Sequence, residues 1–206
     1  GEESELAMTE NSQPSIMATS VAIFAALEES GKIDKDSFHC VAGHSLGEYS
    51  ALVANKSLNF KDSVELLKIR SKAMQESMPV GTGGMAAIIG GTEEGIAATI
   101  SDISSEGKIF IANDNAVGQV VISGEMKAID YIVENSKKLG LKKVIKLSVS
   151  APFHCEFMMK ASVAMQNEID KFNFKTFYVP LYSNVTSLPC DEIEIKRILV
   201  EQIVKK

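Results

Sequence analysis

The stretch GHSLG at residues 43–47 constrains the fold more than any other part of this sequence. A short apolar run at residues 38–42 precedes it, and residues 49–54 follow it with a helical pattern. This order predicts a strand, a tight turn and a helix. Small residues on both sides of Ser45 allow the strained backbone that lifts a serine hydroxyl out of such a turn. We therefore interpret Ser45 as a candidate nucleophile, with a purely structural, glycine-bounded turn as the alternative.

The start of the expected helix supplies donors for negative charge that develops beside the serine. The first turn of a helix has backbone N–H groups with no partner inside the helix. Leu46 follows Ser45 directly, so its N–H is well placed to stabilise an oxyanion.

A serine hydroxyl needs a base at neutral pH, and histidine usually provides it. The sequence contains His39, His44 and His154. His39 lies in the expected strand before the turn and is interpreted as a structural residue. His44 is adjacent to Ser45, where backbone direction points the two side chains apart. His154 follows a strand end in a turn fixed by Pro152, so elimination leaves it as the candidate base.

The segments around this turn are predicted to be mostly helical. Apolar residues recur every three or four positions after Pro14, which indicates an amphipathic helix with proline in its first turn and an end at Gly31. A further helix is expected over residues 62–78, before a proline- and glycine-rich break at residues 79–84. Near the C-terminus the pattern predicts a helix over residues 156–172, a strand over 179–183 and a last helix from about residue 191.

In the middle of the chain the predicted elements are mainly strands separated by helices. Strands are expected at residues 85–89, 109–113, 119–123 and 144–149, and helices at residues 93–103 and 125–139. Thr92 can cap the first of these helices, and Glu93 and Glu94 favour its positive end. The resulting βαββαβ order is the split βαβ unit of ferredoxin-like folds. We therefore predict an inserted subdomain at residues 84–146, flanked by residues 1–83 and 147–206.

Composition excludes several classes of protein. The net charge of −6 provides no general attraction to nucleic acid or to an anionic membrane. The longest apolar run, residues 21–27, is far shorter than the roughly 20 residues of a membrane-spanning helix. The three scattered cysteines have neither disulfide-framework nor zinc-site spacing, which favours a reducing cytoplasm and no metal. The acidic N-terminal residues lack the features of a signal peptide and an initiator methionine, so we expect a soluble, cytoplasmic chain that begins inside a longer protein.

Several motifs taken together resemble one family. They are GHSLGEYS at residues 43–50, Arg70, GTGGMA at residues 81–86, GQVVI at residues 118–122 and APFH at residues 151–154. This combination is similar to the malonyl-CoA:acyl-carrier-protein transacylases, over nearly the whole chain. The resemblance implies an α/β fold, in which the ferredoxin-like subdomain at residues 84–146 sits on an α/β-hydrolase-like core. It also implies transfer of a malonyl group from coenzyme A to an acyl carrier protein for fatty-acid biosynthesis, with no cofactor.

The resemblance also implies roles for individual residues. Ser45 corresponds to the acyl-accepting nucleophile, His154 to its base, and Leu46 to the residue whose amide forms half of the oxyanion hole. Arg70 corresponds to the clamp for the malonyl carboxylate, a task that a planar guanidinium performs with two parallel hydrogen bonds. Spacing alone would instead make it a solvated helix residue near Glu65 or Glu76.

Three further residues have counterparts near the substrate in that family. Asn113 and Asn115 match an asparagine pair, with an ordinary turn between strands as the alternative. Phe153 resembles the malonyl-selective form, because a bulky ring leaves little room for an α-methyl branch. Members of the family extend beyond both ends of this chain, so the resemblance implies an incomplete core that lacks the second oxyanion donor and the residue that orients the histidine.

The sequence alone leaves three more functions open. A serine esterase or thioesterase would use the same turn but normally has an acidic residue between the serine and the histidine. The candidates Asp102, Asp114 and Asp130 all fall in the expected subdomain. The second function is that of a non-catalytic carrier-binding module, and the third is that of a malonyl-specific domain of a polyketide synthase.

Docking of an acidic carrier protein requires a local basic patch. Lysines cluster around the last helix and strand of the expected subdomain, at Lys137, Lys138, Lys142, Lys143 and Lys146. They form either that patch or a solvated lysine-rich face.

Overall fold

The structure is a computed structural model that describes residues 1–34 and 36–206. The chain divides into two compact units. Unit 1 contains residues 1–9, 74–161 and 203–206, and unit 2 contains residues 10–73 and 162–202. Within the described residues, no helix combines the length and the apolar character that crossing a membrane demands.

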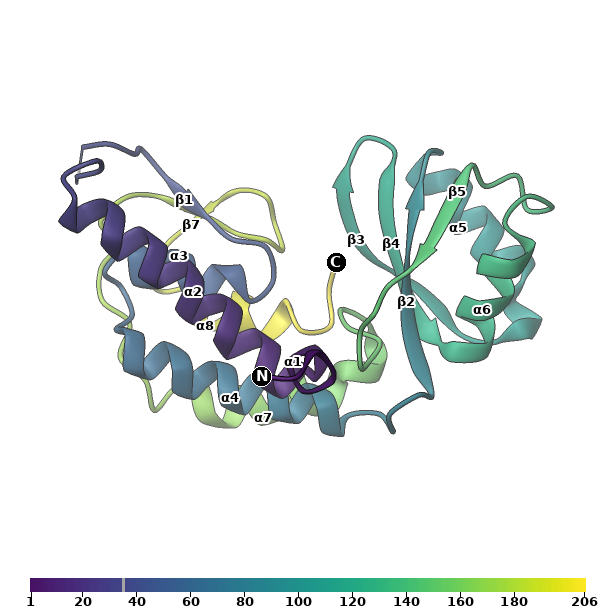
Figure 1. Cartoon of the computed structure of the whole chain (residues 1–206), viewed down its shortest axis with the longest axis horizontal. Helices are drawn as coiled ribbons and strands as arrows, with labels where there is room; N and C mark the ends of the chain where they lie inside the picture. The colour runs from purple at the N-terminus through teal and green to yellow at the C-terminus, as the bar shows by residue number, and fades with distance from the viewer. Residues whose placement is uncertain (35) are drawn as a thin grey trace. The chain divides into compact units, whose positions relative to one another are not determined.

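Unit 1 is built on a four-stranded sheet with the order β3-β4-β2-β5. Its strands are β2 (Gly83–Ile89), β3 (Ile109–Ala116), β4 (Gln119–Glu125) and β5 (Lys143–Lys146), and every neighbouring pair is antiparallel. The helices α5 (Glu93–Asp102) and α6 (Met126–Asn135) cover one face of this sheet, as Figure 1 shows. The predicted strand-helix-strand-strand-helix-strand order is therefore confirmed.

Alternating side chains explain why this segment folds as a covered sheet. Ala86 and Ile88 of β2 point to one face, where they pack with buried residues of α5 and α6 such as Ile96 and Ile129. The intervening Met85 lies in a second apolar cluster. The predicted cap is also present, because the Thr92 hydroxyl accepts a hydrogen bond from the Gly95 N–H (3.2 Å).

Two elements of unit 1 are shorter than predicted. The helix α6 ends at Asn135 instead of reaching residue 139, because a turn follows in which Gly140 has a φ of 71°. The strand β5 ends at Lys146, after which the Leu147 N–H still bonds the Met85 carbonyl (2.9 Å). The rest of the unit includes α1 (Glu3–Ala7), which the sequence did not predict, and the short 3₁₀ helices η1 (Ser104–Glu106) and η2 (Glu156–Met158).

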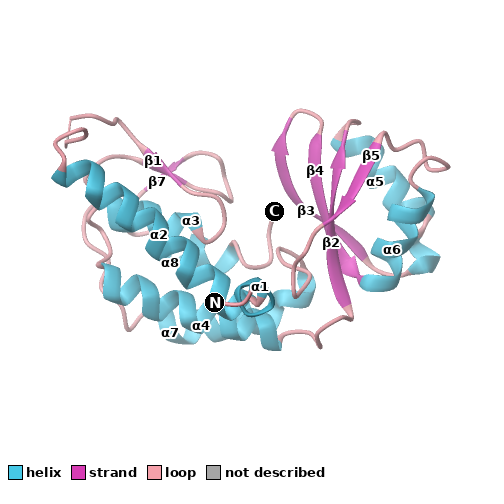
Figure 2. Ribbon diagram, viewed as in Figure 1, coloured by secondary structure: helices cyan, strands magenta, loops and turns pink. Residues whose placement is uncertain are grey.

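Unit 2 is mainly helical, with a small sheet of order β1-β6-β7 (Figure 2). Its helices are α2 (Thr9–Glu29), α3 (Gly47–Ala54), α4 (Phe60–Glu76), α7 (Met159–Ile169) and α8 (Ile195–Glu201), of which α2, α4 and α7 contain the boundaries with unit 1. The strands are β1 (Val41–Ala42), β6 (Leu181–Tyr182) and β7 (Pro189–Cys190). Strand β1 pairs in parallel with β6, which pairs antiparallel with β7. This arrangement places the turn after β1 beside the loop after β6.

Several predictions for unit 2 were wrong in detail. Helix α2 begins at Thr9, so Pro14 lies inside the helix and not in its first turn. The cause is packing, because Gln13 is buried although the apolar periodicity only begins after it. The strands expected at residues 38–42 and 179–183 pair over only two residues each. Helix α8 starts later than residue 191, because the preceding residues form a turn on the side chain of Asp191.

Candidate active site

Ser45 lies in the turn between β1 and α3, as the sequence predicts. Its φ of 52° is in the left-handed region, which costs a non-glycine residue on the order of 1–3 kcal/mol. Two side chains hold this backbone: the Ser45 N–H donates to Asn184 Oδ1 (2.6 Å), and the Ser45 carbonyl accepts from Gln202 Nε2 (3.0 Å). Leu46 has helical φ and directly precedes the first residue of α3. The strained turn is thus held from both sides by the C-terminal part of unit 2.

The two glycines of GHSLG have different tasks. A Cβ atom built on Gly43 would lie 2.0 Å from both the carbonyl carbon and the carbonyl oxygen of Gly47. A Cβ atom on Gly47 would meet no neighbouring atom within 4 Å. The close approach of backbone to backbone therefore requires glycine at position 43 only.

Replacing Gly43 with alanine is expected to lower the free energy of unfolding by about 3 kcal/mol or more, because two backbone segments would have to separate. The matched control is Gly47→Ala, which should be close to neutral, since alanine is the better helix former. Chemical denaturation of both variants measures the difference. Equal losses of stability would contradict this steric explanation.

Arg70 extends from α4 to the serine. Its side chain is only 1% exposed, so the interpretation as a solvated residue near Glu65 or Glu76 was wrong. The Nη2 atom donates to Ser45 Oγ (3.0 Å) and to Gln202 Oε1 (2.8 Å), and Nη1 donates to Gln13 Oε1. Burial lowers the pKa of Arg70, although a guanidinium stays charged in proteins. The structure thus places a permanent positive charge directly on the candidate nucleophile.

A buried carboxylate organises the same site. Glu48 is fully buried on α3. Its Oε1 accepts from the Asn184 N–H (2.7 Å), and its Oε2 accepts from Gln202 Nε2. Burial raises the pKa of Glu48 to about 7, although Asn184, Gln202 and Arg70 each oppose that shift. Glu48 therefore binds both residues whose side chains hold the Ser45 backbone, Asn184 through its backbone N–H and Gln202 through its side-chain amide.

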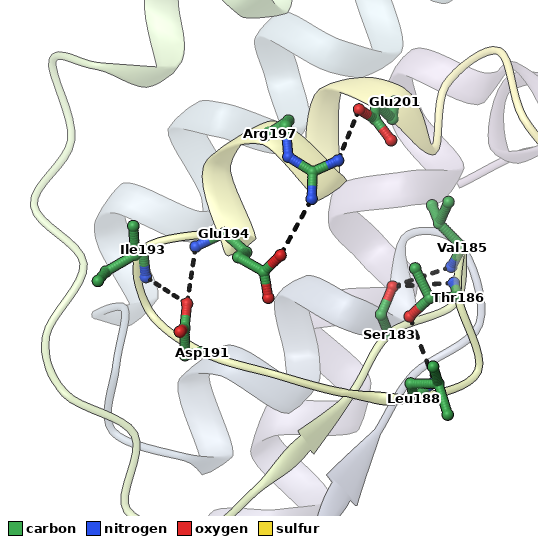
Figure 3. Close-up of polar contacts among 9 residues, drawn as sticks. All are labelled: Ser183, Val185, Thr186, Leu188, Asp191, Ile193, Glu194, Arg197 and Glu201. Carbon is green, nitrogen blue, oxygen red and sulfur yellow. Dashed lines mark hydrogen bonds and ion pairs between the residues drawn. The ribbon is translucent and has the colours of Figure 1, made fainter.

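Asn184 and Gln202 lie at the two ends of the segment that runs from the loop after β6 through α8. Figure 3 shows polar contacts within this segment. Asn184 lies in a turn in which the Ser183 hydroxyl accepts from the N–H groups of Val185 (3.0 Å) and Thr186 (3.3 Å). Asp191 Oδ1 accepts from the N–H groups of Ile193 and Glu194 (both 2.9 Å) just before α8.

Arg197 forms two ion pairs on the exposed face of α8. It donates to Glu194 (3.2 Å) and to Glu201 (2.7 Å), as Figure 3 shows. Such exposed pairs contribute little stability individually. Both pairs lie along α8, and the residue that follows this helix is Gln202.

His154 lies in unit 1, where it is 5% exposed and has a φ of 56°. It stands just before η2, in a loop held by a hydrogen bond from Cys155 Sγ to the Pro152 carbonyl (3.1 Å). The other two histidines are exposed. His39 lies before β1, so its interpretation as a structural residue of a strand was wrong.

The remaining predicted site residues also belong to unit 1. Phe153 packs partly buried against the apolar cluster that contains Met85. Asn113 and Asn115 lie within β3, where the pairing with β4 is irregular, so the alternative of an ordinary turn was wrong. Asn113 is buried and Asn115 is exposed. The structure thus brings together Ser45, Leu46 and Arg70, whereas the pairing of Ser45 with His154 stays a prediction.

Comparison with known proteins identifies the family. The family model for the acyl transferase domain matches residues 1–205. This chain belongs to the acyl transferase domain family.

The relatives of this acyl transferase are similar in sequence and longer. The malonyl CoA-acyl carrier protein transacylase of Bacillus subtilis is 40% identical over 205 residues, which are 98% of this chain and 63% of the relative. The protein of the same name from Staphylococcus aureus (strain COL) is 37% identical over 204 residues, with 98% and 64% covered. The chain thus spans less than two thirds of the curated relatives it matches.

Solved structures agree with this family membership. The acyl-carrier-protein-S-malonyltransferase of Bartonella henselae has a TM-score of 0.92 and 41% identity, over 100% of this chain and 66% of that one. A malonyl-transacylase in complex with its type II PKS acyl-carrier protein has a TM-score of 0.92 and 36% identity, with the same coverage. The mixed α/β fold predicted from the sequence is therefore confirmed.

Sequence reasoning missed four site residues of this acyl transferase: Gln13, Glu48, Asn184 and Gln202. Glu48 carried a signal, because it lies three residues after Ser45 inside the GHSLGEYS motif. The other three are common polar residues in segments whose pattern predicts only helix or loop. Among the described residues, no group of three or more His, Cys, Asp or Glu side chains is placed to hold a metal ion.

Proposed function

We propose that this acyl transferase moves a malonyl group from coenzyme A to the phosphopantetheine thiol of an acyl carrier protein, through a malonyl ester of Ser45. The observation that carries the proposal is the hydrogen bond from the buried Arg70 guanidinium to Ser45 Oγ. A neutral acyl group has no charge of its own for the guanidinium to bind. A malonyl group has a second carboxylate, which a guanidinium binds with two charge-assisted hydrogen bonds.

Arg70 has N–H donors in addition to those that its present partners use. A guanidinium carries five N–H donors, and three of them are engaged by Gln13, Ser45 and Gln202. Its Nε is buried and, among the described residues, has no hydrogen-bond partner. The side-chain oxygens of Gln13 and Gln202 accept hydrogen bonds from the guanidinium. The oxygens of a carboxylate would be equally suitable acceptors for the same N–H groups. We propose that the two glutamines hold the guanidinium in place until the substrate carboxylate arrives.

The proposed reaction has two symmetrical steps. His154 takes the proton of Ser45 while Oγ attacks the thioester carbonyl, and the oxyanion is stabilised by the Leu46 N–H at the start of α3. The carbon–sulfur bond then breaks, and coenzyme A leaves with the proton from His154. In the second step the carrier thiol gives its proton to His154 and its sulfur attacks the malonyl ester. The ester carbon–oxygen bond then breaks, and His154 returns the proton to Ser45 Oγ. No group beyond the two thiol substrates is needed.

The proposed architecture follows the same resemblance. We propose that residues 84–146 form an inserted ferredoxin-like subdomain and that residues 1–83 and 147–206 belong to an incomplete α/β-hydrolase-like core. The strand order β3-β4-β2-β5 supports the first part, and the strand-turn-helix around Ser45 supports the second. We also propose that Asn113, Asn115 and Phe153 face the substrate. A cytoplasmic location is supported by Cys40, Cys155 and Cys190, which are all free thiols.

Transfer to a carrier, as opposed to hydrolysis, is the part of the proposal that an experiment decides most directly. After brief mixing with malonyl-CoA, the intact mass of the protein should increase by one malonyl group. A phosphopantetheinylated carrier should remove that group and gain it. Release of free malonate at the same rate with and without the carrier would instead make the protein a thioesterase, and carrier binding without any adduct would make it a non-catalytic module.

A second experiment tests whether a group of lysines in unit 1 binds the carrier. Lys137, Lys138, Lys142, Lys143 and Lys146 are all exposed near the end of α6 and along β5. Reversing the charge at Lys142 and Lys143 should raise KM for the carrier and leave KM for malonyl-CoA unchanged. The matched control reverses Lys61 and Lys68, two exposed lysines on α4. An unchanged carrier KM would identify the lysines of unit 1 as a solvated face.

A further inference from the structure

The backbone of Ser45 is unusual because side chains, rather than backbone groups alone, fix both of its polar atoms. Its N–H donates to Asn184 Oδ1 and its carbonyl accepts from Gln202 Nε2. These partners come from separate elements of unit 2, the loop after β6 and the end of α8. Because Ser45 has a left-handed φ, this pair of bonds holds a conformation that the residue would not keep by itself.

Both partners are in turn held by the carboxylate of Glu48. One oxygen accepts from the Asn184 backbone N–H (2.7 Å), and the other accepts from Gln202 Nε2. An ionised carboxylate only accepts hydrogen bonds. It therefore requires the NH₂ group of Gln202 to face Glu48, which leaves the Gln202 carbonyl oxygen for Arg70 (2.8 Å).

We propose, on the basis of the malonyl transfer proposed above, that Glu48 and Gln202 form a positioning pair. The carboxylate of Glu48 sets the orientation of the Gln202 amide, and that amide holds the Ser45 backbone and the Arg70 guanidinium in one arrangement. Neither residue touches the reacting atoms. Their task is to keep the nucleophile and the carboxylate clamp aligned for each acyl transfer.

Protonation of Glu48 changes this arrangement in a defined way. A protonated carboxyl group can donate as well as accept, so it no longer requires the NH₂ group of Gln202, and the orientation of that amide is then set by Arg70 and the Ser45 carbonyl alone. Burial raises the pKa of Glu48 to about 7. The charged or titratable groups that interact electrostatically with Glu48 are Arg70 on α4, Tyr49 on α3 and Cys190 on β7. The amide of Gln202 should therefore respond to pH with a midpoint near 7.

The variant Glu48→Gln tests the pair, because it keeps the size and the acceptor for Asn184 but adds a donor that faces Gln202. We expect malonyl-CoA to acylate this variant about 10- to 100-fold more slowly in a single turnover. Gln202→Leu should show a loss of similar size. The matched controls are Glu65→Gln and Gln166→Leu, which alter exposed residues of α4 and α7 and should acylate at the unaltered rate.

The pH dependence of the side-chain NH₂ resonances of Gln202 distinguishes a positioning role from a merely structural one. These resonances are assigned by their absence in the Gln202→Leu variant. In the unaltered protein they should shift between pH 6 and 8, and in Glu48→Gln they should be insensitive to pH. This titration is preferred to a pH-rate profile, because a histidine base also gives an acidic limb. The shift itself is measured in the unaltered protein, and the two variants provide the assignment and the control.

The outcomes separate the two proposals. Slow acylation of Glu48→Gln together with loss of the Gln202 titration supports the positioning pair. Acylation at the unaltered rate, or Gln202 resonances that are indifferent to pH in the unaltered protein, overturns it. If the unaltered protein forms no malonyl adduct while Gln202 still titrates with Glu48, malonyl transfer fails and the coupling of the two side chains stands.

Discussion

Ser45→Ala should form no malonyl adduct, and its transfer of malonyl groups to the carrier should fall by about 10⁴-fold or more, because no other group replaces the attacking oxygen. Alanine tolerates the left-handed φ of this position about as poorly as serine does. The backbone bonds to Asn184 and Gln202 are also retained. The loss should therefore reflect chemistry and not a change in the fold.

Intact mass spectrometry after incubation with malonyl-CoA, followed by mapping of the modified peptide, measures this result. Ser101→Ala, on the exposed surface of α5, is the matched control and should acylate normally. A thermal unfolding midpoint close to that of the unaltered protein verifies that the variant folds. A malonyl group retained on Ser45→Ala would refute the assignment of the nucleophile.

Arg70→Ala should lower kcat/KM for malonyl-CoA by about 10²- to 10³-fold, because the substrate carboxylate would be buried without its partner charge. The loss for acetyl-CoA, which has no second carboxylate, should be about tenfold or less. A residual effect on acetyl transfer is expected, since Arg70 also donates to Ser45 Oγ. The ratio of the two losses thus separates recognition of the carboxylate from support of the nucleophile.

Arg70→Lys provides the control for this comparison. Lysine keeps the positive charge but replaces a rigid fork of donors with a single point charge. It cannot bind Gln13, Ser45 and Gln202 while also holding a carboxylate in two places. Its preference for malonyl over acetyl should therefore lie between those of the unaltered protein and Arg70→Ala. Equal losses for both donors in Arg70→Ala would exclude the clamp.

Local pattern was enough to predict the sheet of unit 1. Strands β2 and β4 contain unbroken runs of apolar or small residues, Thr92 caps α5, and both helices have apolar faces. The same local reasoning misplaced the start of α2 and the lengths of β1 and β6. Those bounds depend on partners that are distant in the chain: Gln13 accepts a hydrogen bond from Arg70, and Val41 pairs with Leu181.

The sequence by itself determined the strand-turn-helix that carries Ser45, because small residues on both sides of a serine allow the strained backbone of a sharp turn between a strand and a helix. It also determined the βαββαβ order of unit 1, because hydrophobic periodicity is a local property. Only the tertiary structure decided that Arg70 is buried on Ser45 and that Glu48, Asn184 and Gln202 surround the turn. Gln202 lies 157 residues from Ser45. A polar side chain in a helix or loop carries no local sign of its partner, since a hydrogen bond depends on where the fold brings two atoms and not on the sequence between them.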